Sequence, residues 1–546
     1  MSAGRYAIGV DFGTESGRAL LLDVESGRDL ATSAVRYRSG VIDRELPSGN
    51  ERLPADWALQ DPDDWVHVLE QAIPDVIKEA GVAADEVGGL GIDFTSCTVL
   101  PTTSDGAPLC RMERWRDRPH AWPKLWKHHA AQPVADRLNQ VALERQEDFL
   151  ERYGGRISSE WYFPKLIQVW LEDHEVYDAA ERFIEATDWI IWHLTGTECR
   201  QSATAGFKAM WSPDEGLPSS EYFTAAYPGF DQPAEKLGDR FVPLGSRAGT
   251  LHAEVAERIG LPDSVAVAVG NVDAWVSVPG AGVDSPGTFV IVIGTSICDM
   301  VVHPDEIRLP GITGVVKDGI LPGIYGYEAG QAAVGDMLAW FVDRLSERRE
   351  DYEELERAAS ELAPGETGLV ALDWWNGNRT ILADADLSGA LFGLTLQTRR
   401  EDIYRALMES IAFGSRRIMD NFEEHGVELT QIVACGGIAE RSPLMMQLLA
   451  DTSGREVHVP DSHEIPARGA ALFGAVAAGA FADIGAAIES TRPKSMRSYS
   501  PDAQAGKTYE KVYAIYRRLY DMLGRSEVEL LHGLKQIRNE QLERSG

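Results

Sequence analysis

The chain has 546 residues, 44% of them hydrophobic and 14 of them Trp, and this length predicts roughly two to four domains with well-filled cores. Its 52 Lys and Arg residues face 85 Asp and Glu residues, which gives a formal net charge of −33. That charge repels phosphate backbones and anionic lipids, so we expect no nucleic-acid partner and no membrane partner.

The cysteines and the apolar patterning indicate the compartment. The five cysteines are scattered and none lies in a C-x-x-C pair, which argues against a disulfide framework or a zinc site. No window approaches the ~18 continuous apolar residues of a membrane helix, and the N-terminus carries no signal-peptide pattern. We therefore expect a cytoplasmic protein.

The first part of the chain predicts a strand meander followed by a helix and a further strand. Apolar, β-branched runs bounded by turn residues indicate the strands, and an apolar period of 3.6 residues indicates the helix. The predicted elements are strands at 5–11, 18–23 and 31–38, a helix at 62–80 and a strand at 87–93.

The second part opens in the same way and then alternates helices with strands. The predicted elements are strands at 288–293 and 297–302, an amphipathic helix at 331–347, a long helix at 401–424, a strand at 431–437, a helix at 441–453, a strand at 455–460, a helix at 468–480 and a charged helical tail at 507–543.

This repeated order predicts a duplicated α/β domain with a cleft between the two copies. The stretch "PGAGVDSPG", residues 279–287, concentrates Gly and Pro and marks the boundary. We assign residues 1–283 to the first domain and residues 284–546 to the second.

Each half opens on a hairpin turn made of glycine and hydroxyl residues. Glycine lets backbone amides approach an anion closely, and neighbouring hydroxyls donate further hydrogen bonds, so such turns can bind phosphate. An ordinary hairpin is the alternative, and the duplication favours phosphate. The residues are Gly13, Thr14, Ser16 and Gly17 in the first half and Gly294, Thr295 and Ser296 in the second.

Asp11 ends an apolar strand immediately before the first turn. A carboxylate beside polyphosphate is repulsive unless Mg²⁺ lies between them, and Mg²⁺ is held by one or two carboxylates together with water and phosphate. The alternative is a strand-end Asp that caps the turn; the duplicated context favours the metal.

A third glycine-rich element, "ACGGIAERSPLMMQLLAD" at 434–451, runs from a strand through Gly436 and Gly437 into a helix. The glycines leave room for a flat ring against the backbone, and the helix N-terminus offers free N–H groups. A tight strand-to-helix crossover explains the same pattern. Its position after two phosphate-like hairpins favours a nucleoside site.

Five segments in this order resemble the FGGY carbohydrate kinases of the actin/hexokinase/Hsp70 ATPase superfamily, from about residue 5 to about residue 520. That resemblance implies an α/β fold of two duplicated ribonuclease H-like domains with an interdomain catalytic cleft. The segments are "VDFGTESGRALLLD", "GNVDAWVSVPGAG", "VIVIGTSICDMVV", "ACGGIAERSPLMMQLLAD" and "EIPARGAALFGAVAAG".

Further segments, among them "GIDFTSCTVLP", "GFKAMW", "GYEAGQAAVGDMLAWFV" and "ALDWWNGNRTILAD", are most similar to the ribulokinase branch of that family. This implies transfer of the ATP γ-phosphoryl group to the 5-hydroxyl of L-ribulose in pentose and L-arabinose catabolism, with Mg²⁺. Such a transfer needs in-line positioning, charge neutralisation and a group that accepts the hydroxyl proton. Asp273, in "GNVDAW", matches the catalytic base of the family.

The resemblance also assigns the binding residues. For ATP these are Thr14, Gly294, Thr295, Ser296, Gly436, Gly437, Ser442 and Gln447, with Asp11 on Mg²⁺. For the sugar they are Ser96, Lys208, Asp273 and Glu328. Charge-assisted hydrogen bonds from such donors and acceptors suit a polyol.

Two questions stay open at this point. Ser96 stands where this motif carries Ala, and its extra hydroxyl bears on which sugar fits, so D-ribulose, ribitol and D-xylulose are alternatives. A non-catalytic, ATP-gated sugar-binding protein on the same fold is a further alternative, although a base in the cleft favours the enzyme. Homodimerisation is common in such kinases and is a further expectation.

Overall fold

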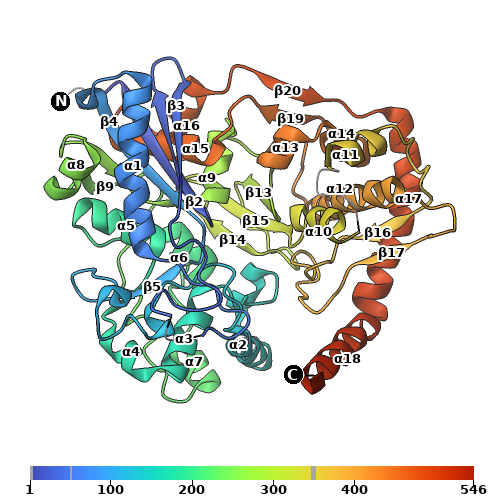
Figure 1. Ribbon diagram of the computed structural model, residues 1–546, viewed down its shortest axis with the longest axis horizontal. Coiled ribbons are helices and arrows are strands. Elements are labelled where there is room, and N and C mark those ends of the chain that lie inside the picture. Colours follow the sequence, from blue (N-terminus) through green and yellow to red (C-terminus); the bar gives the residue numbers. More distant parts are fainter. Residues whose placement is uncertain (1–3, 50–51, 346–351, 546) are drawn as a thin grey trace.

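A computed structural model describes residues 4–49, 52–345 and 352–545 of the chain (Figure 1). Each half is built on a seven-stranded mixed sheet, with helices packed against its faces. The first sheet has the order β3 (Arg28–Arg36), β2 (Ser16–Asp23), β1 (Tyr6–Phe12), β4 (Val87–Phe94), β10 (Ala266–Ala268) and β9 (Arg247–Thr250), with β11 (Asn271–Val272) also paired to β4.

The second sheet repeats the plan of the first. In both, a first strand pairs antiparallel with the next strand of a hairpin and parallel with a later strand: β1 with β2 and β4, β12 with β13 and β18. The predicted duplication of an α/β unit is therefore confirmed. The order is β14 (Gly314–Lys317), β15 (Tyr325–Gln331), β13 (Ile297–His303), β12 (Thr288–Ile293), β18 (Gln431–Cys435), β19 (Val457–Pro460) and β20 (Met496–Tyr499).

Helix α1 (Pro62–Ala80) shows how local sequence sets the ends of an element. Its N-cap Asp61 accepts a hydrogen bond from the Asp63 amide, and Pro62 occupies the first turn, where no amide partner is lost. Gly81 ends the helix in the left-handed conformation, with φ of 66°. Its buried stripe, which includes Trp65 and Val68, packs on the first sheet.

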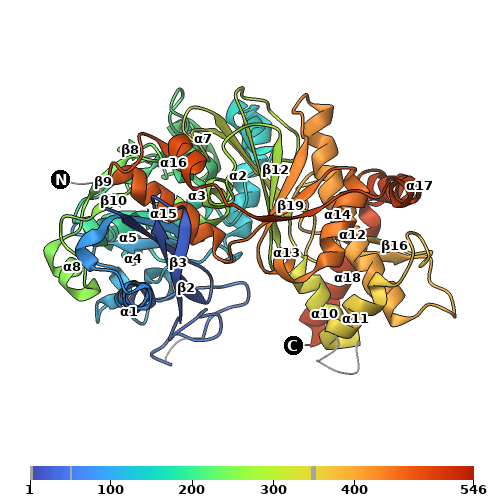
Figure 2. The ribbon, with the colours of Figure 1, turned by 90° about the horizontal axis from the view of Figure 1, so that it is seen from above.

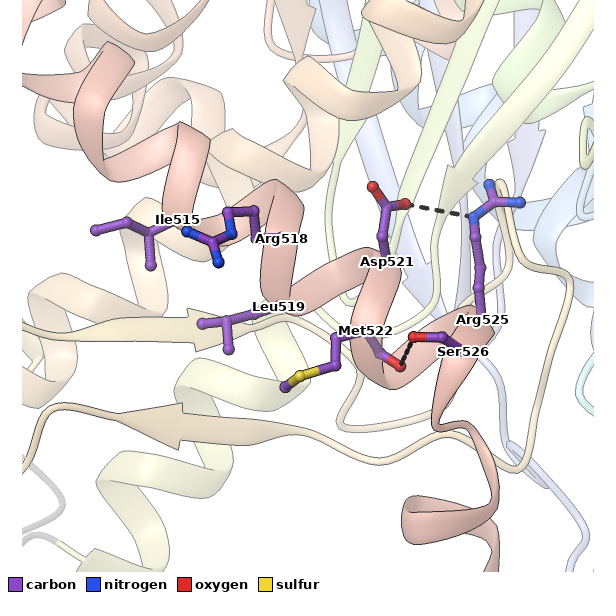
Figure 3. Close-up of a pocket in the computed structure, with 7 residues that line it drawn as sticks. All are labelled: Ile515, Arg518, Leu519, Asp521, Met522, Arg525 and Ser526. Atoms are coloured by element: carbon purple, nitrogen blue, oxygen red, sulfur yellow. Dashed lines mark hydrogen bonds and ion pairs between the residues drawn. The ribbon is translucent and has the colours of Figure 1, made fainter.

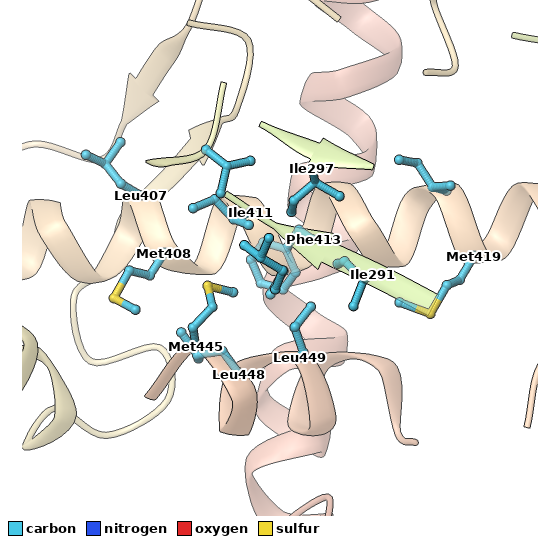
Figure 4. Close-up of a cluster of buried hydrophobic side chains, with 14 of the residues drawn as sticks. Ile291, Ile297, Leu407, Met408, Ile411, Phe413, Met419, Met445, Leu448 and Leu449 are labelled. Carbon is cyan, nitrogen blue, oxygen red and sulfur yellow. The ribbon is translucent and has the colours of Figure 1, made fainter. Parts of the chain in front are cut away.

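The core of the second half lies between its sheet and two helices, α12 (Arg400–Glu424) and α14 (Pro443–Ser453), as Figure 4 shows. Ile291 and Ile297 come from the sheet, Phe413 from α12, and Met445 and Leu449 from α14, and all five are almost fully buried. Each such side chain stabilises the fold by about 1.5–3 kcal/mol relative to exposure.

Helix α15 (Ile465–Ala477) belongs to the second half by sequence but packs on the first sheet, against β1, β4 and helix α9 (Asp273–Gly280). In Figure 2 it lies among the blue and green elements. The approach is close because Gly9 and Gly91 face it without side chains: a Cβ atom on either would overlap the α15 backbone. The two halves thus share a packed element.

The chain between β4 and β9 includes a helical lobe built on α2 (Gln132–Arg145), α3 (Tyr162–Glu172) and α7 (Ser220–Ala226), while α5 (Ala186–Thr195) packs on the first sheet. Leu138, Phe163 and Tyr222 are buried in the core of the lobe. Helix α6 (Ser202–Ala209) leads from this lobe to the second half, where Gly206 packs directly against Val316 of β14.

Two predicted helices differ from the structure. The helix expected at 331–347 is α10 (Gly335–Leu345), because Gln331 still pairs with Ile297 in the sheet; positions 346 and 347 lie outside the described residues. The tail expected as one helix is α17 (Ala503–Asp521) and α18 (Glu529–Ser545), separated by a π-helical turn at Met522–Ser526. Gly524 in that turn packs against Leu382 and Trp374.

All five cysteines are free. In the three described stretches of the chain, no helix combines the length and apolar character needed to cross a membrane.

Candidate active site

Three aspartates gather at one edge of the first sheet. Asp11 and Asp93 are register partners on the parallel strands β1 and β4, and Asn271 on β11 is the next partner of Asp93, two residues before Asp273. Because parallel strands end at the same edge, Asp11, Asp93 and Asp273 come together there. Arg18 on β2 donates a hydrogen bond of 3.2 Å to Asp11.

Burial and mutual repulsion change the acidity of this group. Burial, with the charge of Asp11 as a second cause, raises the pKa of Asp273 to about 7; the Ala274 amide donates to Asp273 Oδ1 and partly offsets the rise. The same two causes raise the pKa of Asp93 well above its ordinary value. A carboxyl group of pKa near 7 is suited to accept a proton at neutral pH.

The pair of Asp11 and Asp93 fits a divalent cation. Asp93 is fully buried, and neither of its carboxylate oxygens accepts a hydrogen bond from a donor group in the described part of the chain. Mg²⁺ is held by one or two carboxylates with water and phosphate completing the shell. No cluster of three or more His, Cys, Asp or Glu residues suited to a metal occurs among the described residues.

Thr14 and the Gly294–Ser296 turn occupy equivalent places in the two halves. Gly13 N donates to Ser16 O at 3.0 Å, and Gly294 N donates to Ser296 O at 2.9 Å, so each turn is closed tightly at the strand ends. Gly294 and Thr295 are exposed at the tip. The Trp126 indole N–H donates to Thr14 Oγ1 at 3.0 Å, which fixes the Thr14 side chain.

Gly436 lies beside the second turn, because β12 and β18 are parallel neighbours with Val292 opposite Cys435. Its φ of 90° and the 2.7 Å between a Cβ atom placed there and Ile293 O require glycine. Gly437 then begins the short helix α13 (Gly437–Arg441). The turn at Gly294–Ser296, predicted to bind phosphate, and the crossover at Gly436 and Gly437, predicted to bind the nucleoside, are therefore adjacent.

Ser442 and Gln447 are engaged within the protein. Ser442 Oγ accepts from the Met445 amide as the N-cap of α14 and donates to Glu356 at 2.6 Å. Gln447 Nε2 donates to Asp451 and to Ser500 O. A nucleoside contact by either side chain stays a prediction.

Lys208 and Glu328 join the two halves. Lys208 Nζ on α6 lies 2.7 Å from Glu328 Oε1 on β15, and the Trp275 indole N–H donates to Glu328 Oε2 at 2.7 Å. Burial lowers the pKa of Lys208, but the Glu328 charge and hydrogen bond outweigh burial, so the net pKa is raised and the amine stays charged. This ion pair links α6 of the first half to β15 of the second. A sugar contact by either side chain stays a prediction.

Ser96 is the remaining predicted sugar residue. It is half-buried in the turn that follows β4, next to Cys97, whose φ is 62°. The preceding Thr95 amide donates to Phe12 O at 3.0 Å, which ties this turn to the strand of Asp11. The structure therefore brings Ser96 to the same sheet edge as Asp11 and Asp273.

Sequence reasoning missed Asp93 and Trp275. Both stand inside quoted motifs, "GIDFTSC" and "GNVDAW". Asp93 ends the strand predicted at 87–93 as Asp11 ends the strand predicted at 5–11, and this signal could have found it. Nothing in the sequence distinguishes Trp275 from a core residue. Their contacts depend on the strand register across β1, β4 and β11 and on the approach of β15.

An open hollow of about 640 Å³ lies elsewhere, on the C-terminal helices (Figure 3). Its lining comes entirely from residues 515–526 and includes Ile515, Leu519 and Met522. It contains none of the predicted site residues.

Comparison with known proteins covers nearly the whole chain. The model of the FGGY family of carbohydrate kinases, N-terminal domain, matches residues 6–280, and the C-terminal domain of the same family matches residues 289–478. A ribulokinase of Halalkalibacterium halodurans is 48% identical over 550 residues, and a ribulokinase of Shouchella clausii is 47% identical over 550 residues. Each alignment covers 98% of both chains.

Solved kinase structures share the fold. A gluconate kinase from Lactobacillus acidophilus superposes with a TM-score of 0.80 at 18% identity, covering 96% of this chain and 99% of that one. At this identity the likeness concerns the fold, an actin-like pair of α/β units.

Proposed function

The chain belongs to the FGGY family of carbohydrate kinases, and we propose that it is a ribulokinase that transfers the γ-phosphoryl group of ATP to the 5-hydroxyl of L-ribulose. The full-length similarity to ribulokinases supports the reaction. The observation that carries the proposal is Asp273, a half-buried carboxyl group of pKa about 7 at the sheet edge that also carries Asp11 and Asp93.

Asp273 is the proposed general base. Its carboxylate accepts the proton of the 5-hydroxyl as that oxygen attacks phosphorus. Helix α9 begins at Asp273, so the backbone of the base is held fixed at the end of β11. Lys208 and Glu328 hold other sugar hydroxyls through charge-assisted hydrogen bonds, and Ser96 lies at the same edge.

The nucleotide is proposed to lie along the second half. The turns at Thr14 and at Gly294, Thr295 and Ser296 offer amides and hydroxyls to phosphates, and Gly436 and Gly437 leave room for adenosine. Asp11, with Asp93 beside it, would hold Mg²⁺, which neutralises charge on the phosphates when bound. The hydrogen bond that Arg18 donates to Asp11 orients the Asp11 carboxylate.

The substrate is tested by ADP release from Mg·ATP with L-ribulose, D-ribulose, ribitol, D-xylulose, glycerol or no sugar. We expect clear preference for L-ribulose and little hydrolysis without sugar. Preference for another pentulose or pentitol would support the kinase activity but change the assigned substrate, and Ser96 would be the first residue to substitute. Hydrolysis indifferent to sugar would instead support an ATP-gated binding protein.

The base is tested with Asp273→Asn, which keeps the size of the side chain and removes its basicity. We expect kcat to fall by about 10²–10⁴-fold, as loss of a positioned base does, while ATP binding measured by calorimetry stays within threefold. Turnover near the wild-type level would contradict the assignment.

Three further features belong to the proposal. The domain boundary near residue 283, a cytoplasmic location consistent with five free cysteines, and a homodimer all stay predictions.

A further inference from the structure

Trp126 contacts the turn at Thr14 from a distant part of the chain, and the proposed reaction has not used it. Its indole N–H donates to Thr14 Oγ1 at 3.0 Å, across 112 positions of the sequence. A second side chain holds the same residue: Nε2 of the buried Gln60 donates to the Thr14 carbonyl oxygen at 2.8 Å. Both the backbone carbonyl and the hydroxyl of Thr14 are therefore fixed from outside the turn.

The backbone of the segment 122–126, which carries Trp126, is held by hydrogen bonds to other parts of the chain. Lys124 N donates to Val99 O at 2.8 Å, and Val99 N donates to Lys124 O at 3.0 Å. The carbonyl of Leu125 accepts from Lys165 Nζ at 2.8 Å. Because these bonds hold the two residues before Trp126, its indole ring reaches Thr14 from a fixed backbone.

The Thr14 hydroxyl still has a hydrogen to donate. A hydroxyl group has one donor and two acceptor positions, and the Trp126 N–H takes one acceptor position. The hydroxyl hydrogen therefore points away from Trp126. Among the residues that the structure describes, none accepts a hydrogen bond from it. Thr14 is half-buried, so a ligand can reach this donor.

The two glycine turns divide the phosphates of the proposed ATP complex between the halves. The crossover at Gly436 and Gly437 is adjacent to the turn at Gly294–Ser296, so the nucleoside and the phosphates next to it belong to the second half. Thr14 instead follows β1 at the sheet edge of Asp273, the proposed base for the attacking hydroxyl. The phosphate beside Thr14 is therefore the γ-phosphate, which is transferred to that hydroxyl.

We propose that Trp126 is a positioning residue for this transfer: by donating to Thr14 Oγ1, it aims the Thr14 hydroxyl at the γ-phosphate of ATP. This inference rests on the proposed function. The hydrogen bonds run from the indole N–H to the hydroxyl and from the hydroxyl to a phosphate oxygen, and no proton is transferred. Each bond in such a chain strengthens the next. A hydroxyl that loses its orienting donor therefore binds the γ-phosphate less tightly.

The test measures nucleotide binding by calorimetry, and turnover with L-ribulose, in Trp126→Phe, which keeps an aromatic ring and removes the N–H group. We expect the Kd of Mg·ATP to rise about threefold to tenfold, the contribution of one hydrogen bond. The Kd of Mg·ADP, which has no γ-phosphate, should stay unchanged. The value of kcat/KM for ATP should fall at least as much as ATP binding, and the KM for L-ribulose should stay unchanged.

Substitutions at Thr14 show whether Trp126 acts through the hydroxyl. Thr14→Val removes the hydroxyl at nearly the same shape and should weaken Mg·ATP binding about tenfold to a hundredfold, as loss of a hydrogen bond to a charged group does. Adding Trp126→Phe to Thr14→Val should weaken binding no further, because no hydroxyl is left to orient. Thr14→Ser keeps the hydroxyl, so in that background Trp126→Phe should have the same effect as in the wild type.

Trp122→Phe is the matched control. The Trp122 indole N–H donates to Arg116 O at 2.9 Å, so this change also removes one indole hydrogen bond from the segment 122–126 but leaves Thr14 untouched. It should leave the Kd of Mg·ATP unchanged. If Trp126→Phe shows no cooperative thermal transition, Trp126→Met, which also lacks the N–H group, takes its place in every comparison.

The outcomes separate the two proposals. Failure of the wild type to phosphorylate L-ribulose would contradict the proposed function, whatever the nucleotide affinities of the variants. In a wild type that works, three results would overturn the role of Trp126 alone: Mg·ATP binding unchanged in Trp126→Phe, Mg·ATP and Mg·ADP weakened equally, or a loss that adds in full to that of Thr14→Val. An equal loss in Trp122→Phe would overturn it too, because the fixed segment rather than the indole N–H would then matter.

Discussion

At Asp273, the behaviour of a residue depends on what surrounds its carboxyl group. In the sequence, an Asp in the segment "GNVD" is typical of a turn, and only the family resemblance predicts a catalytic role for it. In the folded chain, burial and the nearby charge of Asp11 raise its pKa to about 7, well above the usual value for Asp. The same residue type at Asp105, exposed and bonded to Thr103, has a lowered pKa instead.

A pH profile tests this environment. The base acts only when ionised, so kcat/KM for the sugar at subsaturating Mg·ATP should fall about tenfold per pH unit below about pH 7 and level off above it. Mg²⁺ bound beside Asp11 would offset the negative charge of Asp11, which helps to raise the pKa of Asp273. Saturating Mg·ATP should therefore move the fall in activity to lower pH.

Glu464 provides the control for this profile. Burial raises its pKa to about 7 as well, and its carboxylate lies 3.5 Å from Arg18, near the same site. In Glu464→Gln the acid limb should persist. A limb that disappears in this variant, or a profile flat down to pH 5, would show that Asp273 does not govern it.

At the scale of elements, helix α15 depends on glycines in strands far away in the sequence. Gly9 on β1 and Gly91 on β4 allow its backbone to lie directly on the sheet, and Gly280 in α9 and Gly469 in α15 allow the two helices to touch. The sheet edge that carries Asp11 and Asp93 is therefore held by contacts that need the absence of side chains.

We expect Gly91→Ala to lower the free energy of unfolding by about 1–3 kcal/mol or more, because the added methyl group overlaps the Ala470 carbonyl and both partners are backbone. Urea denaturation followed by circular dichroism measures this. Gly533→Ala is the matched control in α18, where a Cβ atom meets nothing within 4 Å. It should stabilise the protein by about 0.5–1 kcal/mol through helix propensity. Equal effects of the two changes would contradict the close packing of α15.

The two halves of the molecule are not separate in their packing. Lys208 of the first half pairs with Glu328 of the second, and α15 of the second half covers β1 and β4 of the first. A division of the sequence near residue 283 therefore cuts between two sheets but removes α15 from the sheet on which it packs.

Expression of residues 1–283 and 284–546 as separate fragments tests this dependence. We expect the first fragment alone to lack a cooperative thermal transition, because the buried face under α15 becomes exposed, and co-expression of both fragments to restore a complex on size-exclusion chromatography. A first fragment that unfolds cooperatively alone would show that α15 is dispensable to its sheet.

Short sequence patterns determine many of the helices, strands and turns of this protein. Strand periodicity, caps such as Asp61 and glycine turns are properties of short segments, so the sequence alone predicted the duplicated sheets, helix α1 and the turns at Thr14 and Gly294. Residue motifs, compared with a known family, also supplied Asp11, Lys208, Asp273 and Glu328.

Other features required contacts between distant segments. Asp93 lies beside Asp11 because of strand register, and the predicted tail breaks at Gly524, which packs against Leu382. The strand that ends at Gln331 shortens the helix predicted there. Burial and long-range charge set the pKa of Asp273, and neither is a property of neighbours in the chain. Folding therefore fixed the chemistry of the site, while the sequence pattern had already specified the elements that carry it.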